Sequence, residues 1–172
     1  MLTNTAKAGG VYKVVCHDAD GNFKWEETTH NLVVNQGLQD MNTKYFKGSA
    51  YTAAWYLGLV TGPGSGTTFA AGDTLASHAG WTEFTNYSGS RKAVTFGTAT
   101  TADPSVIDNS ASPSQFTITS SGGVVAGAFL CNAASGTTGV LFSAADFQSP
   151  GDRTVVSGDT LTVTYTFSLD AV

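Results

Sequence analysis

The chain has few charged residues. Lysine, arginine, aspartate and glutamate make up 12% of its 172 residues, about half of the roughly 25% typical of soluble domains. Eight residues are basic, thirteen are acidic, and the formal net charge is −5. The basic residues are scattered, apart from the neighbours Arg91 and Lys92, and so few cannot form the basic surface that binds phosphates. We therefore predict no nucleic-acid partner.

Long apolar runs are also missing. No stretch approaches the roughly 20 apolar residues that a membrane-spanning helix needs. The first ten residues, MLTNTAKAGG, lack the charged start and apolar stretch of a secretory signal. The sequence therefore predicts no membrane partner and folding in a cytoplasm.

Cysteine is scarce as well. Cys16 and Cys131 each lie in an apolar, strand-like segment. Because cytoplasmic disulfides are rare, two buried thiols are the favoured interpretation. A disulfide between them is the alternative, which sequence alone leaves open.

Small polar residues and threonine take the place of charge, and they favour strands and turns over long helices. The clearest predicted strand is TLTVTYTFSL, residues 160–169, in which apolar and polar residues alternate without a break. One face of such a strand packs against a core, and the other meets water. The predicted core face consists of Leu161, Val163, Tyr165, Phe167 and Leu169.

Residues 11–34 are predicted to form a hairpin, because Asp20, Gly21 and Asn22 are strong turn residues between two strand-like runs. The period then changes to that of a helix, which we place at residues 36–47. Its predicted apolar face consists of Leu38, Met41 and Tyr45, with Asn35 as N-cap and Gly48 as stop signal.

Two segments, AAWYLGLVTG and GGVVAGAFLCN, are apolar on both faces. Strands of this kind need cover on both sides. The core supplies one side, and the helix or a neighbouring subunit is the expected cover on the other. Together the segments predict an all-β chain, an antiparallel β-sandwich with a jelly-roll-like arrangement and one helix near residues 36–47. We expect a single domain over residues 1–172, with the hairpin at 11–34 as an arm.

Motifs for chemistry are absent from the sequence. The glycine-rich stretch GPGSGTT, residues 62–68, lacks the lysine that a phosphate-binding loop places after its last glycine. His17, His30 and His78 form no close pair of the kind that binds zinc. The sequence therefore predicts no metal, no cofactor and no enzymatic activity.

One stretch does combine polar and aromatic residues densely. ASHAGWTE, residues 76–83, is followed by Tyr87 and Arg91. A structural loop is the first interpretation, with Trp81 buried at the sandwich edge and Glu83 paired with Arg91. A partner contact is the second, because Trp, Tyr and Arg are common anchors of protein interfaces, and an active site is the third. The predicted partner-interface residues are Trp55, Tyr56, His78, Trp81, Glu83, Tyr87 and Arg91.

Several strings in the sequence resemble a family of bacteriophage proteins. They are AAWYLGLVTG, DTLASHAGWTEFTNYSGSRKAVTFG, GVLFSAADF and VVSGDTLTVTYTFSL, and the similarity covers about residues 30–169. The family is that of the capsid cement, or decoration, proteins of short-tailed phages. The resemblance implies a jelly-roll-like fold, small symmetric oligomers and a place on the outer surface of the capsid. It carries no catalytic residues.

The expected function is therefore that of a structural virion protein. It would fold in the host cytoplasm, bind the major capsid protein and bridge adjacent capsid subunits so that the head is stabilised. We favour a homodimer, with a homotrimer as the other possibility. The alternative is a tail-fibre or receptor-binding module that stacks Trp81 and Tyr87 on a cell-surface glycan. A third hypothesis, a glycan-cleaving enzyme, would use Glu83 and Asp73.

Overall fold

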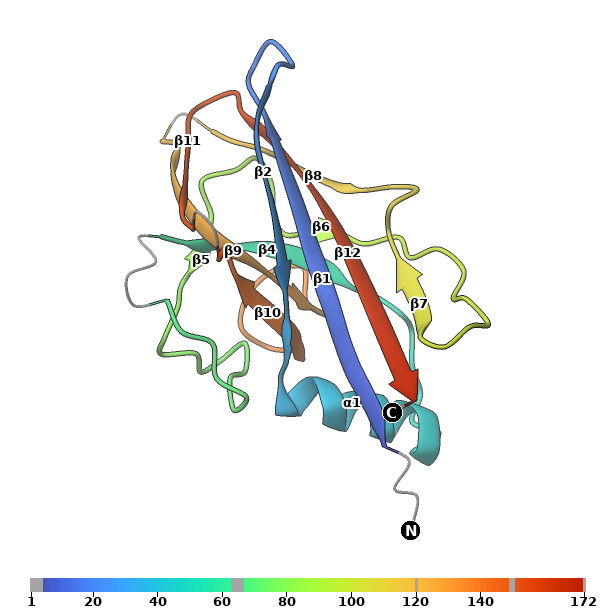
Figure 1. Ribbon diagram of the computed structural model, residues 1–172. Helices are drawn as coiled ribbons and strands as arrows, with labels where there is room; N and C mark the ends of the chain where they lie inside the picture. The colour runs from blue at the N-terminus through green and yellow to red at the C-terminus, as the bar shows by residue number, and fades with distance from the viewer. Residues whose placement is uncertain (1–4, 63–66, 120, 149–150, 172) are drawn as a thin grey trace.

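The computed structural model describes residues 5–62, 67–119, 121–148 and 151–171. The chain is mostly β, with 46% strand and 8% helix, and two antiparallel sheets pack against each other (Figure 1). This arrangement confirms the predicted all-β sandwich, whereas the finer jelly-roll assignment stays a prediction. Most of the predicted glycine loop, residues 63–66, lies outside the described residues.

The first sheet has the strand order β2-β1-β12-β7, with β8 also paired to β12. Its strands are β1 (Ala6–His17), β2 (Phe23–His30), β7 (Ser105–Asp108), β8 (Ser114–Thr117) and β12 (Thr160–Ala171). The second sheet has the order β3-β10-β9-β4-β5, with β6 paired to β4 and β11 to β9. Its strands are β3 (Leu32–Val33), β4 (Tyr56–Thr61), β5 (Glu83–Phe84), β6 (Lys92–Ala93), β9 (Gly123–Cys131), β10 (Leu141–Asp146) and β11 (Arg153–Val155).

The predicted N-terminal hairpin is present, but it is not an arm. Strand β1 pairs with β12 over its whole length, from Ala6 opposite Ala171 to His17 opposite Thr160. On its other side β1 pairs with β2. Because β1 is bonded on both sides, the hairpin is an integral part of the sheet, and the prediction of an arm is wrong. The turn itself is as predicted, with Gly21 at φ 86°.

Hydrogen bonds between tyrosines and a serine join the two sheets. Tyr12 on β1 and Tyr165 on β12 lie with ring centroids 4.7 Å apart, and both are fully buried. Their hydroxyl groups lie 2.7 Å and 3.3 Å from Oγ of Ser143 on β10. The hydroxyl of Tyr165 also accepts a hydrogen bond from Asn31 at 2.9 Å. These polar atoms are therefore satisfied inside the core, as buried hydroxyl groups require.

The apolar face of β12 becomes less buried toward the C-terminal end of the strand. Leu161, Val163 and Tyr165 are fully buried, as predicted. Phe167 is only partly buried, and Leu169 is 38% exposed. The predicted alternation therefore continues past the core and brings an apolar residue to the surface.

Helix α1 (Asn35–Lys47) begins and ends close to the prediction. Gly48 ends it in a left-handed conformation, at φ 60°, which confirms the stop signal. The N-cap differs: it is Val34, with extended backbone and no side-chain hydrogen bond, so Asn35 is not the cap. Gln36 instead ties the start of the helix to β10, since its Oε1 accepts the N–H of Leu141 at 2.9 Å.

Only part of the apolar face predicted for α1 packs against the core. The helix contacts β10 through Gly37, where an added Cβ would lie only 2.5 Å from the backbone oxygen of Phe142. Of the predicted face, Met41 packs partly against the core, whereas Leu38 is 41% exposed and Tyr45 is 83% exposed. The glycine contact sets the rotation of the helix and leaves aromatic residues in solvent.

The second faces of β4 and β9 are covered by the chain itself. Val60 on β4 and Phe129 on β9 are buried in a second apolar cluster with Leu75 and Trp81, and Phe69 packs against it. The cover thus comes from the segment after β4. The expectation that the helix or a neighbouring subunit supplies it is wrong.

Both cysteines are free and buried, which confirms the favoured interpretation. Burial raises the pKa of Cys16 to about 11 and also raises that of Cys131. Neither thiol is therefore a thiolate at neutral pH.

Candidate functional site

The polar and aromatic residues of 73–91 form an internal network, which we call the loop cluster (Asp73, His78, Trp81, Glu83, Tyr87 and Arg91). Trp81 is 5% exposed, and its indole N–H donates to Oδ2 of Asp73 at 3.0 Å. His78 stacks on the indole ring, with centroids 3.9 Å apart. Its Nδ1 lies 2.9 Å from the backbone oxygen of Trp81. The indole N–H of Trp81, Oδ2 of Asp73 and Nδ1 of His78 are therefore all engaged within the fold.

Glu83 and Arg91 form the predicted ion pair. Arg91 donates from Nε and Nη2 to the two carboxylate oxygens at 2.8 Å and 2.7 Å. Its Nη1 donates to the backbone oxygen of Ala133 at 3.0 Å, and its guanidinium lies 5.2 Å from the ring centroid of Phe129. With the arginine side chain 5% exposed and the glutamate side chain 24% exposed, the pair joins the loop to β9.

Tyr87 is also part of the interior. It is 6% exposed and meets Phe116 edge to face, with ring centroids 4.8 Å apart. The ammonium of Lys92 lies 5.4 Å from its ring centroid. Burial, followed by the negative charge of Glu83, raises the pKa of the Tyr87 phenol above its ordinary value. The phenol stays protonated at neutral pH.

These contacts place three of the predicted partner-interface residues inside the molecule: Trp81, Tyr87 and Arg91. Tyr56 is partly buried against the second apolar cluster. The loop cluster therefore fits the first interpretation of the sequence, a structural loop. Among the described residues, no group of three or more His, Cys, Asp or Glu side chains is arranged to hold a metal ion.

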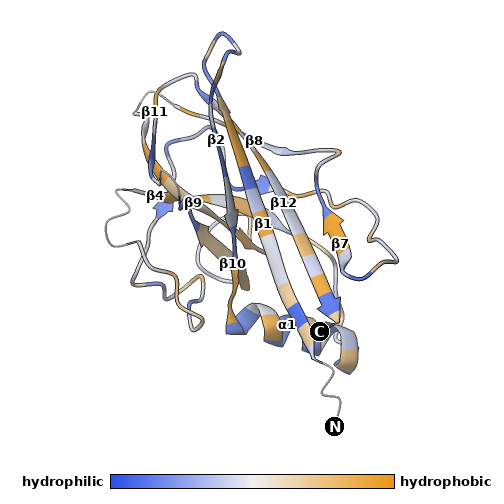
Figure 2. Cartoon of the chain, in the orientation of Figure 1, coloured by the Kyte–Doolittle hydropathy of each residue, from blue (hydrophilic) through white to orange (hydrophobic). Residues whose placement is uncertain are grey.

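A different set of apolar residues is exposed. Most of them belong to α1 and to the end of β12, which lie at the same end of the sandwich (Figure 1), and Figure 2 shows apolar positions along α1. We call this set the α1 face. Tyr45 is 83% exposed and Phe46 is 77% exposed, with their rings in edge-to-face contact at 4.9 Å. Tyr51, Leu38 and Leu169 are 48%, 41% and 38% exposed. An exposed apolar patch of this kind marks a binding surface more often than a cluster whose groups are satisfied internally.

A groove of about 610 Å³ runs across the α1 face. Trp55 lies in its wall, where its indole N–H donates to the hydroxyl of Tyr51 at 2.7 Å. The lining residues are Ala6, Asp40, Met41, Asn42, Lys44, Tyr45, Phe46, Tyr51, Trp55 and Leu169. The groove is therefore mainly apolar, with one acidic and one basic side chain from the helix.

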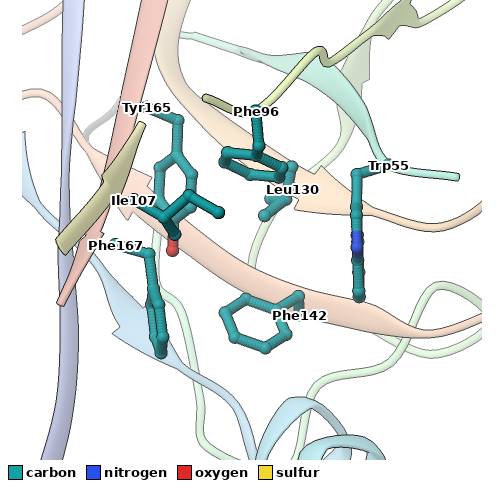
Figure 3. Close-up of a pocket in the computed structure, with 7 residues that line it drawn as sticks. All are labelled: Trp55, Phe96, Ile107, Leu130, Phe142, Tyr165 and Phe167. Atoms are coloured by element: carbon teal, nitrogen blue, oxygen red, sulfur yellow. The ribbon is translucent and has the colours of Figure 1, made fainter. Parts of the chain in front are cut away.

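Behind Trp55 lies a smaller aromatic cleft of about 160 Å³ between the two sheets (Figure 3). Trp55 meets Phe142 edge to face at 5.4 Å, and Phe142 meets Phe167 in the same way at 5.4 Å. The remaining lining residues are Phe96, Ile107, Leu130 and Tyr165. Trp55 belongs to both the groove and the cleft, so it connects the α1 face to the core.

Sequence reasoning found one residue of this site, Trp55, and missed its most exposed members. The helical spacing predicts that Tyr45 faces the core, and the predicted interface does not include Phe46 or Tyr51. A signal was present: Phe46 follows Tyr45 directly, and neighbouring residues lie about 100° apart around a helix. One helix face cannot bury both rings.

Comparisons with known proteins give no relative: no protein-family model, no curated protein and no solved structure matches the chain. In the described part of the chain, no helix is both long and apolar enough to cross a membrane.

Proposed function

We propose that the protein is a structural virion protein, a cement protein that binds the outer surface of a bacteriophage capsid and bridges adjacent subunits of the major capsid protein. The observation that carries the proposal is the α1 face. Five apolar side chains are exposed together there, beside a groove of about 610 Å³. Exposed apolar patches of this kind mark protein-binding surfaces.

The loop cluster supports a binding role over a catalytic one. Glu83 and Asp73 are the acidic residues that a glycan-cleaving enzyme would need. Glu83 is held by Arg91 through two hydrogen bonds, and Asp73 accepts the indole N–H of Trp81 and the backbone N–H of Ala70. Both carboxylates are thus engaged in fixing the loop.

The glycan-binding alternative loses its main support for a similar reason. Sugar rings stack on exposed aromatic faces, and the two residues proposed for stacking, Trp81 and Tyr87, are only 5% and 6% exposed. Trp81 already carries His78 on its ring. The exposed aromatic residues lie instead on the α1 face, next to an apolar groove that suits protein side chains.

Cement proteins act by joining neighbours in a shell that presents many copies of one surface. Two contacts made by one bridging particle reinforce each other, because the second forms at a high effective concentration. Each contact can then be smaller than the roughly 1,600 Å² of a standard stable interface. An acidic sandwich with an exposed apolar end suits such a role.

The test uses the phage whose genome encodes the protein. Particles made without it should lose infectivity faster than normal particles on heating or at low salt, because their heads release DNA. Adding the purified protein back should restore survival. The proposal fails if both kinds of particle survive equally and the protein does not co-purify with heads.

A further inference from the structure

We infer that the start of β1 and the groove beside it form a binding site for an extended peptide segment of a partner protein, which joins the first sheet as an added strand. The inference deepens the proposed function and rests on it only for the identity of the partner, the major capsid protein. The structural grounds are an unpaired stretch of β1, a groove against that stretch and the chemistry of the groove wall.

Strand β1 extends further toward α1 than its neighbour β2 does (Figure 1). It pairs with β12 over its whole length, from Ala6 to His17, whereas β2 pairs with it only from Val11 onward. Among the described strands, none pairs with residues 6–9 on the side where β2 lies. The first sheet therefore has a free edge at its α1 end.

The direction of the free backbone groups follows from the last hydrogen bond between β1 and the chain that leaves β2. The backbone oxygen of Gly10 accepts the N–H of Asn31 at 3.0 Å, so the backbone groups of Gly10 point toward the β2 side. Alternate residues of a strand direct their backbone groups to the same side. The N–H and C=O groups of Ala6 and Ala8 therefore point out of the free edge, whereas those of Lys7 point toward β12. An edge of this kind is a template for another strand.

A groove of about 640 Å³ lies against the free edge. Its lining residues come from the start of β1, from the segment around β3 and from α1: Thr5, Ala6, Lys7, Ala8, Asn31, Leu32, Val33 and Leu38. Leu32 is 37% exposed and Leu38 is 41% exposed. A strand that pairs with the free edge can lay alternate side chains on this apolar wall. Strand addition gains affinity from the backbone and specificity from such side-chain contacts.

The polar groups of the site point to a peptide as the occupant. Ala6 and Ala8 present backbone donors and acceptors in strand geometry, which an apolar small molecule leaves unsatisfied. Oδ1 of Asn31 is buried and has no hydrogen-bond partner in the described part of the chain, although Nδ2 of the same residue donates to Tyr165. Such an acceptor is stabilised when a donor reaches it, and a peptide backbone carries donors at regular spacing.

Charge selects a segment unlike the free edge itself. Lys7 is the one charged residue among the described residues that line the groove, so an acidic side chain is favoured beside it. Residues 5–9 carry this lysine and no acidic residue, and two copies paired edge to edge would bring their lysines together. The occupant is therefore a segment of a different protein, about four residues long in extended form, with apolar side chains at alternate positions and one acidic residue.

The experiment begins with a random library of linear peptides selected on the purified protein. The selected peptides should share apolar residues at alternate positions, an acidic residue and no proline at the centre. A synthetic copy of one of them should slow the amide hydrogen exchange of Ala8 by about 10-fold or more. The amide of Lys7, which already points toward β12, should change little.

Two variants test the two parts of the site. L32S/L38S should weaken peptide affinity about 10-fold or more, because it removes the apolar wall. A8P should weaken it by a similar factor, because proline removes an N–H that faces the free edge rather than β12. The matched control is F23S, since Phe23 is 62% exposed but lies next to the hairpin turn. It should bind the peptide like the wild type.

Strand addition is overturned if selection gives no binding peptide, if bound peptides leave the exchange of Ala8 unchanged, or if they bind L32S/L38S as tightly as the wild type. Protection of Ala8 that rises with the concentration of the protein alone also overturns it, because a second copy then fills the site. Overlapping peptides of the major capsid protein identify the partner separately. Binding by none of them, with selected peptides still protecting Ala8, contradicts the capsid partner and supports the strand site.

Discussion

The loop cluster and the α1 face both gather aromatic and charged side chains, yet the loop cluster buries them and the α1 face exposes them. Trp81 and Tyr87 are 5% and 6% exposed, whereas Tyr45 and Phe46 are 83% and 77% exposed. In the loop cluster the indole N–H of Trp81 donates to Asp73, and the guanidinium of Arg91 donates to Glu83. On the α1 face the rings meet mainly each other and solvent.

The difference shows which aromatic groups are available for binding. A side chain whose ring and polar atoms are already engaged gains little from a partner, and moving it would break contacts inside the fold. An exposed ring gains the burial of its apolar area, about 25 cal/mol per Å². Density of aromatic and charged residues in the sequence is therefore a poor guide to a binding site, and exposure is the better one.

The largest expected effect comes from removing the indole of Trp81. Trp81→Ala should lower the free energy of unfolding by about 3–5 kcal/mol, because a large buried ring leaves a cavity. The same truncation on the α1 face, Tyr45→Ala, should change it by no more than about 0.5 kcal/mol in dilute protein. Urea unfolding measures both. Equal losses in the two variants would erase the distinction between the regions.

The second-largest loss of stability is expected from breaking the Glu83–Arg91 pair. Arg91→Ala leaves Glu83 without its partner and should cost about 3 kcal/mol, the lower end of the range for a buried pair, since Glu83 is partly exposed. The double variant E83L/R91M should lose less than half as much, because no unpaired charge remains. A double variant as unstable as R91A would show that the charges themselves hold the loop.

The packing of α1 against β10 depends on Gly37. Gly37→Ala places a Cβ 2.5 Å from the backbone oxygen of Phe142, so it should destabilise the protein by about 1–2 kcal/mol in spite of the better helix propensity of alanine. Gly72→Ala is the control, because no atom lies within 4 Å of its added Cβ. It should be neutral or slightly stabilising. Unchanged melting of both variants would mean that α1 is not held by the glycine contact.

A further expected effect is a pH dependence. Burial, and then the charge of Asp152, raise the pKa of Asp146 to about 6. The folded state thus holds this proton more tightly than the unfolded state, so the group disfavours folding above pH 6 and less so as pH falls toward 4. Asp146→Asn should stabilise the protein at pH 7 and lose that advantage at pH 4.5.

Asp18 is a matched control, because its pKa is shifted in the opposite direction. Hydrogen bonds from Asn22 lower its pKa, so its contribution is present at neutral pH and is lost only when pH falls below the ordinary aspartate range. Asp18→Asn should therefore destabilise at pH 7. Urea unfolding of wild type and both variants at the two pH values checks the slopes. Parallel curves for D146N and wild type would contradict the account of Asp146.

Local patterns in the sequence predicted much of the fold. The alternation of residues 160–169, the turn at Gly21 and the stop at Gly48 depend on neighbouring residues, and all three are present. The two doubly buried strands, β4 and β9, were also foreseen from their composition. These features need no knowledge of the tertiary structure.

Features set by long-range packing were not predictable in the same way. The rotation of α1 depends on the contact of Gly37 with β10, more than 100 positions away. The cover of β4 and β9 depends on where the loop carrying Trp81 returns. For the same reason the sequence pointed to the loop cluster as the interface, whereas exposed Tyr45 and Phe46 became visible only in the folded chain.

The most direct test of the proposed function is the number and position of copies on an intact phage particle, measured by quantitative mass spectrometry and cryo-electron microscopy of purified virions. A cement protein should be present in hundreds of copies, all on the outer surface of the head. A few dozen copies confined to the tail, or none on the particle, would contradict the account.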